Sequence, residues 1–229
     1  MAEDVTLTIT TCRRLPLFIK TIISLARNIS YNDYKDIVKI VWCDDNSSDD
    51  SRFVIEALIG HVFPVVQCES IFLNESERGL GNSLNRIFQH VDTKYFYHLE
   101  DDWQFQIKKY PIFARSRQIM EENPEIKSVI SRKLDMYSPR KLADGSEFFL
   151  CEKGVDRTGE MRGHGYSLNP SFQDFEFFKK YLPFHLTNVE SSFGNQMYDD
   201  GYRVATIGAD CVQHIGHEIS AFQINNTPR

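Results

Sequence analysis

Three consecutive carboxylates, Glu100, Asp101 and Asp102, follow an apolar run at residues 95–99. Acidic side chains at the end of a buried strand are costly unless water or a cation compensates their charge. Mn²⁺ and Mg²⁺ prefer oxygen ligands, and Mg²⁺ usually binds one or two carboxylates together with the phosphates of a substrate. The triplet therefore indicates either a divalent-cation site or a solvated acidic turn.

A second acidic pair, Asp44 and Asp45, follows another apolar run at residues 37–42. Both runs are typical of buried strands, and open α/β sheets bind their ligands outside the carboxyl ends of such strands. We therefore expect the two acidic groups to lie at the same edge of one sheet. Together the five acids would form a cluster that needs a counter-charge.

Short apolar runs typical of strands alternate along the chain with segments whose apolar residues repeat with helical period. This alternation predicts an α/β fold with a mostly parallel central sheet flanked by helices, and these elements position the acids. Strands are expected at 5–10, 37–42, 62–68, 95–99, 128–130, 204–207 and 211–214. Helices are expected at 15–26, 52–59, 82–91, 110–122, 172–181 and 189–199. The pattern is less regular after residue 108, so we expect a single domain over 1–229 with an irregular second half.

Composition narrows the class of protein. The 229 residues carry a formal net charge of −6 and no run of basic residues, which argues against a nucleic-acid partner. No apolar stretch approaches the roughly 18 residues of a membrane span, so no transmembrane segment is expected. The start Met1-Ala-Glu-Asp4 does not resemble a secretory signal, and the five cysteines form no Cys-x-x-Cys motif. We expect a cytoplasmic protein in a reducing compartment.

Four motifs stand in order along the chain, namely residues 8–14 (Thr-Ile-Thr-Thr-Cys-Arg-Arg), 43–48 (Cys-Asp-Asp-Asn-Ser-Ser), 99–103 (Leu-Glu-Asp-Asp-Trp) and 201–204 (Gly-Tyr-Arg-Val). Together they resemble the motifs of nucleotide-sugar glycosyltransferases of the GT-A fold, close to family 2. The motif at 99–103 resembles the Glu-Asp-Asp form of that family's DxD metal motif. The resemblance implies a GT-A (Rossmann-like) fold, with a nucleotide-binding half at 1–103 and an acceptor-binding, catalytic half at 104–229.

The resemblance also implies an activity: an inverting, hexosyltransferase-type enzyme that moves a sugar from a nucleotide diphosphate donor to a hydroxyl of a glycan or other acceptor. UDP is the nucleotide it favours, with GDP and dTDP left open, and Mn²⁺ or Mg²⁺ is the implied cofactor. Asp45 resembles the residue that bonds the base, although it could also cap the next helix. The other donor-binding positions implied are Thr10, Thr11, Cys12, Arg13, Arg78, Glu100 and Asp101. The sequence does not distinguish Arg13 from Arg14 as the one that reaches a phosphate.

The family pattern assigns the metal and the base by spacing. Glu190 stands eleven residues before Gly201, at the place of the catalytic base, where a simple helix-start acid is the alternative. His214 stands 24 residues after Glu190 and, with Asp102, is the implied metal ligand, with His217 in reserve. This chain has Glu where the family usually has Asp, and residues 191–197 lack the usual basic residue.

The acceptor side is less specific. Trp103, His164 and Tyr166 are candidate acceptor contacts, each with an ordinary structural alternative, namely a core tryptophan for Trp103 and a connecting loop for the other two. A nucleotidyltransferase of similar α/β core is one alternative function, although 11–14 lacks that class's glycine-rich opening. A catalytically silent module that binds sugar nucleotides or glycans is the other. The absence of Gly-x-Gly-x-x-Gly after the first strand disfavours a dinucleotide-binding oxidoreductase.

Overall fold

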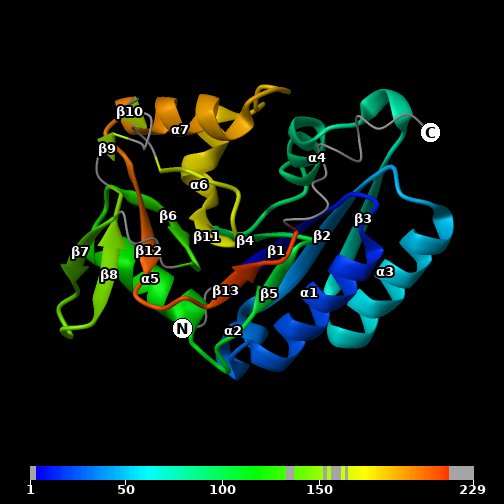
Figure 1. The fold of residues 1–229 in the computed structure, drawn as a ribbon, viewed down its shortest axis with the longest axis horizontal. Coiled ribbons are helices and arrows are strands. Elements are labelled where there is room, and N and C mark those ends of the chain that lie inside the picture. The colour runs from blue at the N-terminus through cyan, green and yellow to red at the C-terminus, as the bar shows by residue number, and fades with distance from the viewer. Residues whose placement is uncertain (1–3, 133–136, 152–153, 156–160, 163–164, 217–229) are drawn as a thin grey trace.

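The computed structural model describes residues 4–132, 137–151, 154–155, 161–162 and 165–216. In this part of the chain nine strands form one mixed sheet (Figure 1). In spatial order they are β3 (Gln67–Leu73), β2 (Ile37–Asp45), β1 (Val5–Thr11), β4 (Tyr95–Glu100), β11 (Ser171–Asp174), β6 (Ile126–Ile130), β12 (Arg203–Ile207), β8 (Glu147–Leu150) and β7 (Ser138–Lys141).

The first half of the chain supplies a parallel core. Strands β3, β2, β1 and β4 run parallel to one another, so their carboxyl ends meet at one edge. Beyond β4 the sheet is mixed, because β11 pairs antiparallel with both β4 and β6. The α/β class and the parallel core are confirmed, and the second half is more antiparallel than the sequence predicts.

Helices cover both faces of the sheet (Figure 1). One core contains Phe18, Ile55 and Ile119, and the opposite core contains Leu84 and Phe193. The helices of the first face are α1 (Leu15–Asn28), α2 (Tyr31–Asp36), α3 (Asp49–Val62) and α5 (Ile112–Glu122). Those of the second are α4 (Leu80–Ile87), α6 (Phe175–Phe178) and α7 (Val189–Asp199), with short 3₁₀ turns η1 (Glu75–Glu77) and η2 (Lys179–Tyr181).

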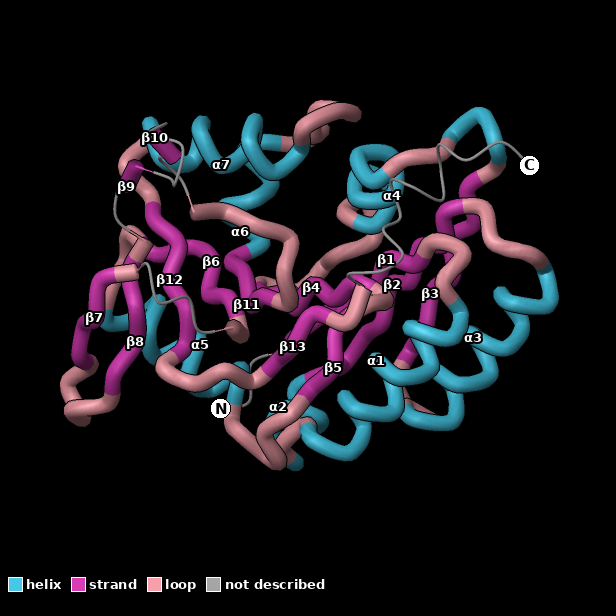
Figure 2. Tube along the Cα trace, in the orientation of Figure 1, coloured by secondary structure: helices cyan, strands magenta, loops and turns pink. Residues whose placement is uncertain are grey.

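Two short ribbons complete the described structure. Strands β5 (Trp103–Phe105) and β13 (Val212–His214) pair antiparallel next to α1 (Figure 2). The other ribbon consists of β9 (Gly154–Val155) and β10 (Met161–Arg162). The first ribbon matters for the site, because it joins the segment after β4 to the last described residues of the chain.

Two expected elements are wrong. The strand expected at 62–68 lies at Gln67–Leu73, because α3 continues to Val62 and Phe63 stacks on Tyr34 with ring centroids 5.4 Å apart. The helix expected at 172–181 begins as a strand, because Phe172 pairs between β4 and β6 before the chain turns helical at Phe175. The other expected helices and strands are present with shifted bounds.

No helix in the described part of the chain has both the length and the apolar character needed to cross a membrane.

Candidate active site

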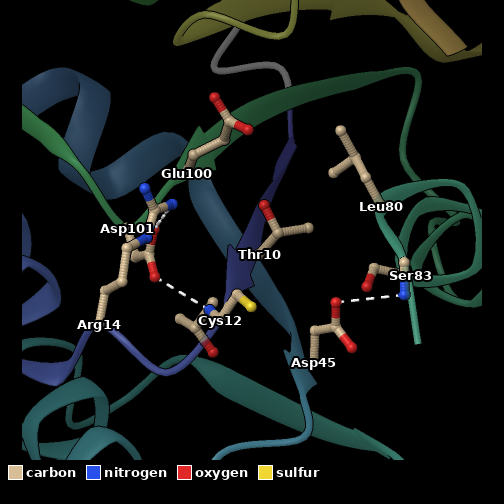
Figure 3. A pocket seen from close by; sticks show the side chains of 10 residues that line it. Thr10, Cys12, Arg14, Asp45, Leu80, Ser83, Glu100 and Asp101 are labelled. Carbon is tan, nitrogen blue, oxygen red and sulfur yellow. Dashed lines mark hydrogen bonds and ion pairs between the residues drawn. The ribbon is translucent and has the colours of Figure 1, made fainter. Parts of the chain in front are cut away.

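The carboxyl ends of β1, β2 and β4 and the start of α4 surround a pocket of about 370 Å³ (Figure 3). This volume lies within the range of ligand pockets. The pocket sits where the strand order of an open sheet places ligands. Its lining residues are Thr10, Thr11, Cys12, Arg14, Asp45, Gly79, Leu80, Ser83, Glu100 and Asp101.

The neighbouring acids of β2 have different tasks, because successive side chains of a strand point to opposite faces. Asp44 is fully buried and accepts hydrogen bonds from Thr11 Oγ1 (2.7 Å), the backbone N–H of Ser47 (2.8 Å) and Arg52 Nε (2.9 Å). Asp45 faces the pocket, where its Oδ2 accepts from the backbone N–H of Gly79 at 3.1 Å. Asp44 therefore holds the turn after β2, and Asp45 is the acid presented to a ligand.

Arg14 ties together the carboxylates that follow β4. Its guanidinium is 7% exposed, forms an ion pair with Asp101 Oδ1 and lies 2.6 Å from Asp102 Oδ2. The second oxygen of Asp101 accepts from the backbone N–H of Cys12 at 3.0 Å (Figure 3). The turn after β1 therefore binds the acidic triplet directly, and Arg14 is the counter-charge that the acids require.

Burial governs the charge state of this cluster. Burial raises the pKa of Glu100 to about 8, and Asp102, Glu190 and Asp101 add to the effect. Burial also raises the pKa of Asp101 to about 7, against the attraction of Arg14. Burial lowers the pKa of Arg14, but Asp101 and Asp102 outweigh it, so the net pKa is raised and the guanidinium stays charged. At neutral pH Glu100 is therefore mostly protonated and Asp101 only about half ionised, so these acids carry less than their full negative charge beside the Arg14 guanidinium.

Asp102 and His214 meet because β5 and β13 pair in a register that places His214 opposite Trp103. His214 Nε2 lies 3.1 Å from Asp102 Oδ2, and the Ile215 N–H donates to the Asp102 carbonyl at 2.8 Å. Gly216 packs against the same carboxylate, since a Cβ there would lie 2.3 Å from Asp102 Oδ2. The family resemblance implied this pair, and the structure brings the two residues together.

The donor set at Asp102 fits a divalent cation only in part. Among the described residues, no three His, Cys, Asp or Glu side chains are grouped to hold a metal. Asp102 Oδ1, however, is buried and has no hydrogen-bond partner in the described structure. One carboxylate and one imidazole leave most positions of a cation to water and phosphate, as is usual for Mg²⁺-type sites. The residues therefore fit a cation that arrives with a diphosphate.

Glu190 lies in the first turn of α7. Its Oε1 accepts hydrogen bonds from Leu168 N (2.6 Å) and Ser167 Oγ (3.0 Å). Its charge also contributes to the raised pKa of Glu100, so the carboxylate of α7 acts electrostatically on the acids where β4 ends. Glu190 thus fastens the segment before β11, a task that its position in the sequence did not indicate.

Several predicted donor residues lie elsewhere or are already engaged. Arg13 lines a separate shallow depression with residues 46–49, where its Nε donates to the Asn46 carbonyl at 3.0 Å. Arg78 does not line the pocket and lies 2.5 Å from Glu75. Thr11 lines the pocket, but its hydroxyl donates to Asp44 and accepts from Trp42 Nε1.

Two of the predicted acceptor residues, Trp103 and Tyr166, are buried. Trp103 is 2% exposed and its ring packs on His214, so the core alternative applies to it. Tyr166 is 3% exposed and packs edge-on against Phe193. Neither ring offers a face to a sugar, because neighbouring side chains cover both. His164 and His217 lie outside the described residues.

Arg14 and Gly216 are the site residues that sequence reasoning missed. The signal for Arg14 was present, since buried acids need a counter-charge and two arginines follow β1, but nothing distinguished it from Arg13. The signal for Gly216 was only its closeness to His214.

Comparisons with known proteins agree with this geometry. Residues 6–119 match the family model described as Glycosyl transferase family 2, which covers β1 to α5 and the whole pocket. No curated protein matches the sequence.

Solved structures share the fold at low identity. A mannosyltransferase from Pyrobaculum calidifontis, in complex with GDP-Man and Mn²⁺, is 13% identical with a TM-score of 0.60 over 89% of this chain and 54% of its own. TarS of S. aureus in complex with UDP is 12% identical, with a TM-score of 0.62 over 91% of this chain and 59% of its own. GalNAc-T7 with UDP, GalNAc and Mn²⁺ is 11% identical, with a TM-score of 0.63 over 93% of this chain and 43% of its own. The fold is thus GT-A-like, and the chain spans 43–59% of the length of these three proteins.

Proposed function

We propose that this chain, which belongs to glycosyl transferase family 2, takes its sugar from a nucleotide-sugar donor and carries out an inverting, metal-dependent transfer from a UDP-sugar to a hydroxyl acceptor. A hexose is the proposed sugar. The observation that carries the proposal is the two-ended pocket, with Asp45 beside the start of α4 at one end and the Arg14–Asp101–Asp102 cluster at the other.

The pocket has features that suit a nucleoside diphosphate. Asp45 carries an acceptor oxygen for the N–H of a base, and uracil presents such an N–H next to its carbonyls. Glu100 and Asp101 line the opposite end, beside Asp102. Two of the three solved neighbours contain UDP and the third contains GDP-Man, so uracil is the first base to test and guanine the second.

The diphosphate end of the proposed site rests on Asp102 and His214. These residues would hold Mn²⁺ or Mg²⁺ through the Asp102 carboxylate and the His214 imidazole. When bound, such a cation neutralises the charge that develops on the leaving diphosphate. Gly216 and Arg14 keep the Asp102 carboxylate in place from two sides.

Glu190 is the proposed base. Leu168 N and Ser167 Oγ donate to its Oε1 and hold the carboxylate, whose charge reaches Glu100 strongly enough to help raise the pKa of that acid. The carboxylate takes the proton of the acceptor hydroxyl as that oxygen forms its bond to the anomeric carbon. The bond from the anomeric carbon to the diphosphate oxygen breaks on the opposite face and its electrons leave with the diphosphate. A single displacement of this kind inverts the configuration.

A ligand screen followed by turnover tests the proposal. Melting curves of the purified protein with UDP, GDP and dTDP, each with Mn²⁺ or with EDTA, should show the largest stabilisation for UDP with Mn²⁺. UDP-sugars should then be hydrolysed slowly in the presence of Mn²⁺, which separates an enzyme from a silent binding module. If no nucleotide raised the melting temperature and no donor were consumed, the proposal would be wrong.

A further inference from the structure

We propose that the Arg14 guanidinium competes with the divalent cation for the carboxylates of Asp101 and Asp102. As a result, the cation binds this chain together with a nucleoside diphosphate and not before it. The inference rests on the proposed function, because it concerns the order in which the donor and its cation enter the same pocket. Arg14 acts through Asp101 and Asp102 and is a positioning residue. It is not proposed to touch the reacting atoms.

The placement of Arg14 follows from the turn between β1 and α1. Arg14 is the N-terminal cap residue of α1 and its carbonyl accepts from Phe18 N, so its backbone is fixed by the helix. Its side chain reaches across to the segment after β4, while Arg13, with φ of 53°, turns toward Asn46 and Ser47. Of the two arginines in this turn, only Arg14 is paired with Asp101 and Asp102 in the described structure.

The contacts of Arg14 use the oxygens that a free cation would need. Asp101 has both oxygens engaged, one by Arg14 and one by Cys12 N. Asp102 Oδ2 is shared by Arg14 Nη1 at 2.6 Å and His214 Nε2 at 3.1 Å. Among the carboxylate oxygens of this pair, only the buried Asp102 Oδ1 has no partner in the described structure. Within this pair of carboxylates, the described structure therefore leaves a cation one open oxygen, Asp102 Oδ1.

The fixed guanidinium repels a cation at that oxygen. Charges a few ångströms apart interact strongly where water is largely excluded, and Arg14 and Asp102 are both more than nine-tenths buried. A divalent cation that binds Asp102 Oδ1 in the absence of nucleotide would lie near the Arg14 guanidinium, with no additional negative charge to offset the repulsion between the two cations. A diphosphate removes this obstacle, because it brings its own negative charge and supplies further oxygen ligands. Metal and nucleotide should thus bind with strong positive coupling.

The test is the affinity for MnCl₂ alone, measured by electron paramagnetic resonance of free Mn²⁺ and by calorimetry. Arg14→Gln should bind Mn²⁺ without nucleotide at least about tenfold more tightly than the wild type, because the repelling charge is gone. Arg14→Lys keeps the charge and should stay close to the wild type. Arg13→Gln is the matched control, since it removes an arginine one position away, and it should leave the affinity unchanged. A merely structural role of Arg14 would not raise metal affinity.

A second measurement keeps the inference open to refutation if Arg14→Gln does not fold. The wild-type affinity for Mn²⁺ should rise at least about tenfold when UDP is present, by linkage between the two ligands. Equal Mn²⁺ affinity with and without bound UDP would overturn the inference, as would an Arg14→Gln protein that binds Mn²⁺ no better than the wild type. Failure of the proposed function looks different, because then UDP does not bind at all, with or without Mn²⁺.

Discussion

Asp44 and Asp45 are adjacent in β2, yet Asp44 is enclosed by hydrogen bonds from Thr11, Ser47 and Arg52, while Asp45 lines the pocket and bonds Gly79. The alternation of side chains along a strand separates a structural acid from a ligand-facing acid within one dipeptide. The pair therefore supplies its own control experiment.

Asp45→Ala should weaken UDP binding by about 1.5–3 kcal/mol, the usual loss for a hydrogen bond to a charged group. Calorimetry with UDP and with N3-methyl-UDP, which lacks the imide proton, measures the effect. Asp44→Asn should instead lower the melting temperature, because a buried acceptor of four hydrogen bonds is changed. Equal losses of affinity for the two nucleotides in Asp45→Ala would contradict the assignment of Asp45 to the base.

Glu190→Gln should lower turnover by about 10²–10⁴-fold, the usual contribution of a positioned base. The variant keeps an acceptor oxygen for Leu168 N and Ser167 Oγ, so its melting temperature and its affinity for UDP should stay near those of the wild type. Initial rates at saturating donor, together with melting curves, separate these effects.

The control for Glu190 is Glu176→Gln, which changes an exposed first-turn acid of α6 that pairs only with Lys179 among described contacts. It should not alter turnover. NMR of the product provides an independent check, since a retained anomeric configuration would exclude Glu190 as the base of a single displacement.

The parallel core and its acids could be predicted because the information is local. Asp45 ends the buried strand β2 and Asp102 lies two residues after the end of β4, and parallel strands bring their carboxyl ends together. The strand β3 was misplaced because it is an edge strand whose apolar residues Ile71, Phe72 and Leu73 come last. An edge strand has less need of a continuous apolar pattern, so periodicity detects it poorly.

The remaining site features depend on pairing between distant segments. Arg13 and Arg14 are the same residue type in one turn, and only the backbone of Arg13, with its positive φ, decides which one reaches Asp101. The burial of Trp103 likewise follows from the β5–β13 ribbon, which joins positions about a hundred residues apart. Composition and spacing carry no signal for either arrangement.

Gly216→Ala should disturb Asp102 without removing a proposed ligand. The new methyl group would lie 2.3 Å from Asp102 Oδ2, so the carboxylate or the backbone at residue 216 must shift, which disturbs the contact between Asp102 and His214. Changes next to metal ligands typically cost about 10–100-fold in metal affinity, and we expect a loss of that size in Mn²⁺ affinity measured with UDP present. Gly60→Ala is the control, because nothing lies within 4 Å of a Cβ at that helical position. Unchanged Mn²⁺ affinity in Gly216→Ala would contradict a metal at Asp102.

The free energy of unfolding should depend on pH through Asp33, a buried acid of α2 that is far along the chain from the acidic triplet. Burial raises the pKa of Asp33 from its ordinary value near 3.8 to about 6, although its Oδ1 accepts from Phe113 N at 3.2 Å. The folded state therefore holds this proton where the unfolded state has lost it. A raised folded pKa means that its stabilising contribution is complete below pH 4 and is lost as the pH rises through 6.

Asp33→Asn removes this titration and keeps an acceptor oxygen for Phe113 N. The free energy of unfolding of the variant, relative to the wild type, should therefore increase by about 2–3 kcal/mol between pH 4 and pH 7. Urea unfolding across that pH range measures this difference. The change of the difference with pH is the test, because the new amide also needs hydrogen-bond partners and can shift the free energy of unfolding by a constant amount at every pH. Asp36→Asn is the comparison, since Asp36 is paired with Arg117 and its loss should not reproduce this pH dependence. A constant difference between Asp33→Asn and the wild type over pH 4–7 would show that Asp33 is ionised in the folded protein throughout.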